Sequence, residues 1–283
     1  MNDWHKVMKH STFRLLDHSN QTTFHQKDYT ALTSFAIDDA LTLSISNQQS
    51  PPTMRLWVHE DTVVLGIPDS RLPHIEAGIQ LLADSGYKAI IRNSGGLAVA
   101  LDQGVLNISL ILPDIKKVSI HDGYEAMFSF IQYMLRDLTN EIKAYEIVGS
   151  YCPGDYDLSI RGVKFAGISQ RRIRDGAAIQ IYLDVEGDSQ GKANLIQEFY
   201  DVSLRGETTK FIYPDVNPHV MGSLSELLGI KLTMEDMKKR VYQTVGELSN
   251  QIISPPFSEA EWTSFQTRLK QMEKRNEKIA AWQ

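Results

Sequence analysis

Two side chains close together in this sequence are capable of covalent chemistry, Cys152 and Lys164. Cys152 is the only cysteine, and a cysteine thiolate is a strong nucleophile that can carry a group as a thioester. Lys164 lies between Val163 and Phe165, where a buried ammonium is costly unless it is paired, so its presence suggests a role. Each residue also has a structural explanation, because a lone cysteine can be a small buried hydrophobic residue and a lysine can point to solvent from an edge strand.

A pair of glycines, Gly95 and Gly96, forms a second feature with possible chemistry. Adjacent glycines let another molecule approach the backbone, because no Cβ blocks it and positive φ angles are available. Their N–H groups can cradle an oxygen-rich or extended ligand, and a plain tight turn between strands is the alternative interpretation. Apolar runs follow at Ala98–Leu101 and Val105–Leu112, which predicts two buried strands joined by a turn over 102–104.

The lysine lies in a predicted hairpin. Residues 157–160 and 163–168 flank the pair Arg161-Gly162, which is a typical two-residue turn, and a third strand is expected over 177–183. Other expected elements are helices over 29–45, 75–85, 124–138 and 194–202, a strand over 88–91, and a hairpin over 54–68 that turns at Glu60-Asp61. Asp38 and Asp39 within the first helix are expected to be solvated.

The last 60 or so residues are expected to be all-helical. Three capping boxes begin at Ser223, Thr233 and Ser258, each before an apolar-periodic segment, and Pro255-Pro256 separates two of the helices. The final segment, 261–283, is rich in lysine and glutamate and is interpreted as a solvated packing helix rather than a recognition element.

Composition and charge narrow the possible classes. The chain has 283 residues, 42% hydrophobic and 23% charged, which is typical of a globular protein with one large or two small domains. A net charge of −6 argues against a nucleic-acid-binding protein, although a local basic patch for an acidic partner domain remains possible. The candidates for that patch are Arg161, Lys164, Arg171, Arg172 and Arg174, and a solvated hairpin edge is the alternative.

The single cysteine excludes an internal disulfide and a cysteine metal cluster, which favours a reducing cytoplasm. The first residues have no apolar core of a secretory signal, and no apolar run is long enough to span a bilayer. Histidines near the N-terminus fit no metal-ligand spacing, so no metal is expected; they are His5, His10, His18 and His25.

Two motifs carry a resemblance to a known family. RNSGGLAV at 92–99, followed by Asp102 and LNIS at 106–109, resembles the signature of the biotin/lipoate ligase and octanoyltransferase superfamily. The string RGVKFAGISQRR at 161–172 is similar to a second pattern of that superfamily, whose lysine lies in the acyl-binding cleft. Leu97 and Leu101 stand where the ATP-using lipoate ligases have a third glycine and a histidine. The sequence looks more like the subgroup that transfers octanoyl groups from the glycine cleavage H protein without ATP.

The resemblance covers about 29–229 and implies an α/β fold (α+β), with mixed β-sheets flanked by helices and a helical C-terminal extension. It implies an N-terminal arm at 1–28 packed on the body, a catalytic domain at 29–229, and the extension at 230–283. It also implies a cysteine nucleophile, Cys152 in SYCPGDYD, partnered by Lys164. The ammonium would favour the thiolate and exchange protons with the leaving and attacking amines.

The implied reaction moves an octanoyl group from octanoyl-lysine of the glycine cleavage H protein to the lipoyl-domain lysine of 2-oxoacid dehydrogenases, through a thioester on Cys152 and without a cofactor. Backbone N–H groups near Gly95-Gly96 or Gly167-Ile168 would hold the oxyanion. The residues expected to bind the substrate are Arg92, Ser94, Gly95, Gly96, Ala98, Gly167 and Ile168.

Three alternatives remain. A related transferase would take octanoyl from acyl carrier protein by the same chemistry. An ATP-dependent lipoate or biotin ligase is disfavoured by Leu97, Leu101 and the position of the cysteine. A non-enzymatic subunit that binds acyl groups or lipoyl domains would leave Cys152 inert.

Overall fold

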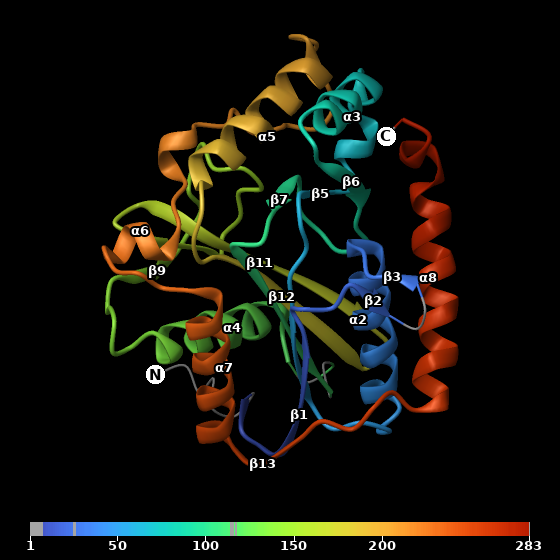
Figure 1. Ribbon diagram of the computed structural model, residues 1–283, viewed down its shortest axis with the longest axis vertical. Coiled ribbons are helices and arrows are strands. Elements are labelled where there is room, and N and C mark those ends of the chain that lie inside the picture. The colour runs from blue at the N-terminus through green and yellow to red at the C-terminus, as the bar shows by residue number, and fades with distance from the viewer. Residues whose placement is uncertain (1–7, 25–26, 114–115, 117, 283) are drawn as a thin grey trace.

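A mixed eight-stranded sheet forms the centre of the computed structural model, which describes residues 8–24, 27–113, 116 and 118–282 (Figure 1). The strands follow the order β13-β1-β4-β8-β12-β11-β10-β9. In chain order they are β1 (His10–His18), β4 (Thr53–Trp57), β8 (Val105–Leu112), β9 (Ile142–Ala144), β10 (Asp157–Ile160), β11 (Val163–Ile173), β12 (Gly176–Asp184) and β13 (Ser249–Ile253).

A smaller three-stranded sheet holds the glycine loop. β5 (Thr62–Leu65) lies between β6 (Lys88–Ile91), to which it is parallel, and β7 (Val99–Leu101), to which it is antiparallel. The hairpin expected over 54–68 is therefore wrong, because β4 pairs with β1 and β8 in the main sheet while β5 belongs to the smaller one. Both strands are buried on both faces, so no alternation marks where the chain leaves one sheet for the other. Two short strands, β2 (Thr23–Phe24) and β3 (Lys27–Asp28), pair antiparallel and form a separate two-stranded sheet.

Helices cover both faces of the main sheet (Figure 1). On one side, α2 (Ala31–Ser46) lies between the sheet and α8 (Glu259–Ala280). On the other side lie α4 (Ile120–Met134) and α7 (Met234–Leu248), and α3 (Ile75–Asp84) and α5 (Ser189–Leu204) pack together near the smaller sheet. The remaining short helices are η1 (Asp69–Arg71), η3 (Pro218–Val220) and α6 (Leu224–Leu228).

The three predicted capping boxes are confirmed at the starts of α6, α7 and α8. α4 begins four residues before the expected start, because Ser119 and Asp122 form a further capping box there. The expectation of an all-helical C-terminal region was wrong in one place, since β13 pairs in parallel with β1 and extends the main sheet. Both ends of the chain thus contribute strands to the central sheet, and the proposed domain division stays a prediction.

Within the described residues, no helix combines the length and the apolar character that crossing a membrane requires.

Candidate active site

Cys152 lies in the loop between β9 and β10, directly against the glycine loop of the smaller sheet. Its sulfur accepts two hydrogen bonds, from the backbone N–H of Leu97 at 3.1 Å and from Nη2 of Arg92 at 3.3 Å. The side chain is partly exposed, and the residue has a φ of 48°, in the left-handed region that L-residues rarely adopt. A nucleophile held in a strained, hydrogen-bonded loop position is typical of an active site.

Gly96 is required where the glycine loop meets the cysteine. Its φ is +104°, and a Cβ added there would lie 2.1 Å from Nη2 of Arg92 and 2.9 Å from the sulfur of Cys152. Gly66 approaches the same loop from β5, where a Cβ would lie 1.9 Å from the carbonyl oxygen of Gly96. Both glycines are therefore explained by close packing of backbone around the thiol.

We expect Gly96→Ala to displace the Arg92 side chain and to lower the rate of Cys152 alkylation by iodoacetamide. Because alanine is strained at this positive φ, the variant should also lose about 1–3 kcal/mol of folding free energy, which would lower its melting temperature. Gly95→Ala is the matched control, because a Cβ at Gly95 meets no protein atom within 4 Å. Equal alkylation rates in Gly96→Ala and the native protein would contradict this packing account.

The Lys164 ammonium is fully buried beneath the cysteine loop and contacts four oxygen acceptors. It forms an ion pair with Oδ1 of Asp157 at 2.8 Å and donates to the carbonyl oxygens of Tyr151 and Cys152, each at 2.9 Å. The fourth contact is Oγ of Ser150 at 3.2 Å. The lysine is therefore paired rather than solvated, and it touches the backbone of Cys152, whereas the sulfur is held by Arg92 and Leu97.

A pocket beside the thiol has an apolar wall. Cys152 lines it together with five of the seven residues that the sequence nominated for substrate binding: Arg92, Gly95, Gly96, Gly167 and Ile168. Aromatic and aliphatic side chains form much of the remaining wall; they include Phe35, Trp57, Val64, Val99, Leu101 and Ile181. A reactive thiol next to such a wall suits an electrophilic carbonyl attached to a hydrocarbon chain.

The two other nominated residues do not line this pocket. Ala98 is fully buried, and its N–H donates to the hydroxyl of Tyr200 at 3.2 Å. Ser94 is buried within the glycine loop, and its Oγ has no hydrogen-bond partner. Ala98 and Ser94 therefore pack within the glycine loop, whereas the other five residues line the pocket, where a ligand can reach them.

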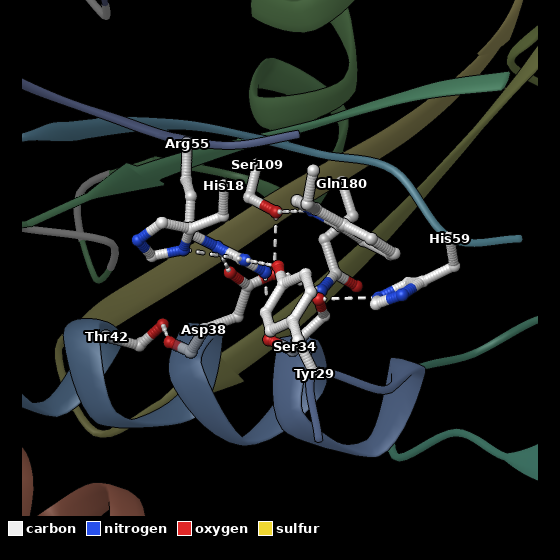
Figure 2. A network of polar contacts seen from close by, with 10 residues as sticks. His18, Tyr29, Ser34, Asp38, Thr42, Arg55, His59, Ser109 and Gln180 are labelled. Atoms are coloured by element: carbon white, nitrogen blue, oxygen red, sulfur yellow. Dashed lines mark hydrogen bonds and ion pairs between the residues drawn. The ribbon is translucent and has the colours of Figure 1, made fainter. Parts of the chain in front are cut away.

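A buried polar network fixes the inner wall of the pocket (Figure 2). Oδ2 of Asp38 accepts hydrogen bonds from Ser109 and from the pocket residue Gln180, each at 2.6 Å. Ser109 in turn accepts from Nε1 of Trp57 at 2.9 Å, and Oδ1 of Asp38 pairs with Arg55 at 2.8 Å. Two pocket side chains, Trp57 and Gln180, are thereby held through one carboxylate.

The expectation that Asp38 and Asp39 are solvated was wrong. Their exposed fractions are 1% and 4%, because both carboxylates face strands of the main sheet. Asp38 pairs with Arg55, and Asp39 accepts a two-pronged ion pair from Arg171 at 2.6 and 3.0 Å. Burial of two acids in a helix is compensated by these arginines.

The same pairs break up the proposed basic patch. Arg171 is bound to Asp39, and Lys164 is buried against Asp157. Arg161 is exposed and lies 3.5 Å from Glu141. Three of the five candidate charges therefore already have acidic partners within the chain.

Two histidines near the pocket, His18 and His59, are buried. The sequence predicted a surface position for His18 and gave no prediction for His59. His18 bonds to Arg55, and Nε2 of His59 lies 2.8 Å from Oγ of Ser34 (Figure 2). Burial first, and then the positive charge of Arg55, lowers the pKa of each histidine to about 3. His10 is half-buried, and His5 and His25 lie outside the described residues.

We expect His59→Gln to be less sensitive to acid than the native protein. Because the folded-state pKa lies below the unfolded value, stability from His59 is present above pH 6.5 and lost as the pH falls toward 3. Between pH 7 and pH 5 that loss is about 2 kcal/mol. Desolvation raises the pKa of buried Asp69 to about 6 and that of buried Asp184 to about 7. Their protonation therefore stabilises the folded protein as the pH falls over the same range, in the native protein and in the variant alike. Urea unfolding of both proteins at the two pH values therefore isolates the histidine; a constant difference between them would contradict its buried, neutral state.

Sequence reasoning did not single out Asp157 or the N–H of Leu97. Asp157 is on β10, which pairs antiparallel with β11, and its carboxylate reaches the Lys164 ammonium across that pair. A buried lysine needs a nearby negative charge, and Asp157 is the acid on the other strand of the predicted hairpin. The sequence therefore contained the information needed to predict this pair. The Leu97 N–H carries no side-chain signal, because any residue would supply it.

The chain has recognisable relatives. Residues 30–246 match the family described as the lipoyl protein ligase A/B catalytic domain. The chain is 61% identical over 277 residues to octanoyl-[GcvH]:protein N-octanoyltransferase of Oceanobacillus iheyensis, covering 98% of this chain and 99% of the relative. It is 44% identical over 280 residues to lipoyl-[GcvH]:protein N-lipoyltransferase of Listeria monocytogenes, covering 99% of each.

Solved structures share the fold. A chain of the bipartite lipoate protein ligase system from Thermoplasma acidophilum superposes with a TM-score of 0.66 at 17% identity, covering 95% of this chain and 98% of that chain. A lipoate-protein ligase A bound with ATP also gives a TM-score of 0.66, at 15% identity over 92% of this chain and 94% of the other. The expected α/β fold with mixed sheets and flanking helices is confirmed.

Proposed function

Since the chain belongs to the lipoyl protein ligase A/B catalytic domain family, we propose that it acts as an octanoyl-[GcvH]:protein N-octanoyltransferase. The acyl group would move from a lysine of GcvH to the lysine of a lipoyl domain in a 2-oxoacid dehydrogenase complex. The observation that carries the proposal is the Cys152 sulfur, which lines an apolar pocket and accepts two N–H hydrogen bonds. Near full-length identity to relatives with this name supports the choice of reaction.

The proposed chemistry is an exchange of one amide for another through a thioester. The Cys152 thiolate attacks the carbonyl carbon of the octanoyl-lysine amide, the C–N bond breaks, and the donor lysine leaves as an amine after taking up a proton. The acceptor lysine, as a free amine, then attacks the thioester, the C–S bond breaks, and a proton is released. Bonds made and broken balance, so no ATP, metal or redox cofactor is required by this route.

Lys164 is proposed to serve this reaction in two ways. Its contacts with the carbonyl oxygens of Tyr151 and Cys152 support a positioning role, because they fix the loop that carries the thiol. Because the ammonium contacts the carbonyl oxygen of the residue that carries the thiol, we also propose that it exchanges protons with the leaving and attacking amines, with Asp157 as its paired carboxylate. The N–H groups of the glycine loop, close to the sulfur, are the proposed oxyanion donors.

The acyl group can be octanoyl or the related lipoyl group. The Listeria relative is named for lipoyl transfer, and both groups present an apolar chain to the pocket wall. We propose the cytoplasm as the site of action, because a lone catalytic thiol must stay reduced. No nucleic acid or membrane is part of the proposed reaction.

The proposal is tested by supplying one acyl donor at a time to the purified protein and an unmodified lipoyl domain. The donors are octanoyl-GcvH, lipoyl-GcvH, octanoyl-acyl carrier protein, and free octanoate with ATP. Mass spectrometry of the lipoyl domain should show acylation with a GcvH donor and none with octanoate and ATP. Acylation from acyl carrier protein alone, or dependence on ATP, would contradict the proposed donor.

A further inference from the structure

We propose that Asn276 and Arg171 are positioning residues of the acyl-transfer site, because they hold the entrance of the glycine loop, residues 91–93, from two sides. The inference rests on the proposed function and deepens it, since this loop lines the pocket and donates to the sulfur of Cys152. Both residues act through the backbone of the loop entrance, so neither is a catalytic residue.

Asn276 of α8 pairs with the open edge of the smaller sheet. β6 is an edge strand, and its last residue, Ile91, needs a partner on the side away from β5. Oδ1 of Asn276 accepts from the Ile91 N–H at 2.6 Å, and Nδ2 donates to the Ile91 carbonyl oxygen at 3.1 Å. Nδ2 also donates to the carbonyl oxygen of Met272 at 2.9 Å, which fixes the amide. The side chain is buried, so it takes the place of a neighbouring strand.

The residue that Asn276 holds is followed directly by the groups that contact the thiol. Nη2 of Arg92 donates to the carbonyl oxygen of Leu97 at 2.8 Å and to the sulfur of Cys152 at 3.3 Å. The Leu97 N–H donates to the same sulfur at 3.1 Å. A displacement of Ile91 would therefore move both donors relative to the sulfur.

Arg171 of β11 holds the same loop from the main sheet. Its Nη1 donates to the carbonyl oxygen of Asn93 at 2.9 Å. Its Nε and Nη2 contact the two carboxylate oxygens of Asp39 at 2.6 and 3.0 Å. Because Asp39 is buried in α2, this two-pronged pair fixes the orientation of the guanidinium. The buried ion pair thus has a role at the glycine loop.

The helices α8 and α2 connect the two contacts (Figure 1). α8 packs against both α2 and β6, so the helix that carries Asn276 also covers the helix that carries Asp39. The tip of the glycine loop has no comparable support, because a Cβ at Gly95 would meet no protein atom within 4 Å. The loop is therefore fixed at its entrance, and the C-terminal helix belongs to the scaffold of the site.

The test replaces Asn276 with leucine, which is similar in size and makes no hydrogen bond. The Leu97 N–H should exchange with solvent deuterium about tenfold faster or more, because its contact with the sulfur is lost when the loop moves. With octanoyl-GcvH as donor, kcat should fall about tenfold or more, since misplacement by about 1 Å can lower a rate by about 10²-fold. KM for the lipoyl domain should change by less than about twofold, because only the loop is displaced.

Ser258→Ala is the matched control, because it removes a side-chain hydrogen bond at the other end of the same helix. The two positions lie about 27 Å apart along α8. Both variants should have a lower melting temperature, but Ser258→Ala should keep native exchange at Leu97 and native kcat. Native exchange and kcat in Asn276→Leu, or equal changes in Ser258→Ala, would overturn the positioning role.

If Asn276→Leu does not fold, Arg171→Lys decides. An ammonium can still pair with Asp39, but without the planar fork it cannot also hold the Asn93 carbonyl oxygen. The variant should show faster exchange at Leu97 and a lower kcat, and native values of both would contradict the inference.

Hydrogen exchange needs no acyl substrate, so it keeps the two proposals apart. Faster exchange at Leu97 in the variants of a protein that transfers nothing would defeat the proposed function alone. Native exchange and native transfer in both Asn276→Leu and Arg171→Lys would defeat the positioning role alone.

Discussion

Cys152→Ser is expected to abolish acyl transfer, lowering the rate by at least about 10³-fold, while the protein remains folded. Serine is close to cysteine in size, but its hydroxyl is almost entirely protonated at neutral pH and is a weak nucleophile without an adjacent base. The two groups that donate to the sulfur cannot act as such a base, because the Arg92 guanidinium is a cation and the Leu97 N–H is a backbone amide. The measurement is the initial rate of lipoyl-domain acylation with octanoyl-GcvH.

Thermal unfolding provides the control for this variant. The melting temperature should stay close to that of the native protein, since the hydroxyl can accept the Leu97 N–H that the sulfur accepts. Substantial transfer by Cys152→Ser would mean that the donor and acceptor lysines react directly, without a covalent intermediate.

Lys164→Met is expected to cost both stability and activity. Methionine can fill the buried space, but it leaves the carboxylate of Asp157 without its cation, which costs about 3–5 kcal/mol. The carbonyl oxygens of Tyr151 and Cys152 lose their donor at the same time, so the thiol loses its anchor. Misplacement by about 1 Å can lower a rate by about 10²-fold. Urea unfolding and the transfer assay measure the two effects separately.

The double variant Lys164→Met/Asp157→Asn separates charge from positioning. Removing the orphaned carboxylate should recover part of the lost stability, because asparagine carries no charge into the interior. Transfer should remain low, since the carbonyl contacts are still missing. Native stability and native rate in the single variant would show that Lys164 has neither role.

The elements around the site were largely predictable because local signals specify them. Arg161 and Gly162 adopt φ values of 52° and 81°, as the predicted two-residue hairpin requires, and the hairpin brings Lys164 next to Asp157. The capping boxes mark helix starts that the structure confirms. The glycine pair marks the place where backbone approaches the thiol, a contact that needs the missing Cβ.

What the sequence did not reveal depends on long-range packing. Asp38 and Asp39 have the pattern of a solvated helix face, but both face the main sheet, where Arg55 of β4 and Arg171 of β11 pair with them. The strand β13 has an exposed, polar pattern and forms because β1 offers it an open edge. The contact between Arg92 and Cys152 joins two residues that are 60 positions apart in the sequence. One follows a strand of the smaller sheet and the other lies in a loop of the main sheet, so no local pattern predicts that they meet.

The most direct measurement is the intact mass of the native protein after brief incubation with octanoyl-GcvH and no acceptor. The account predicts a species heavier by one octanoyl group, with the modification mapped to Cys152, that disappears when an unmodified lipoyl domain is added and reappears as octanoyl-lysine on that domain. An unmodified protein under conditions in which transfer to the lipoyl domain proceeds would contradict it.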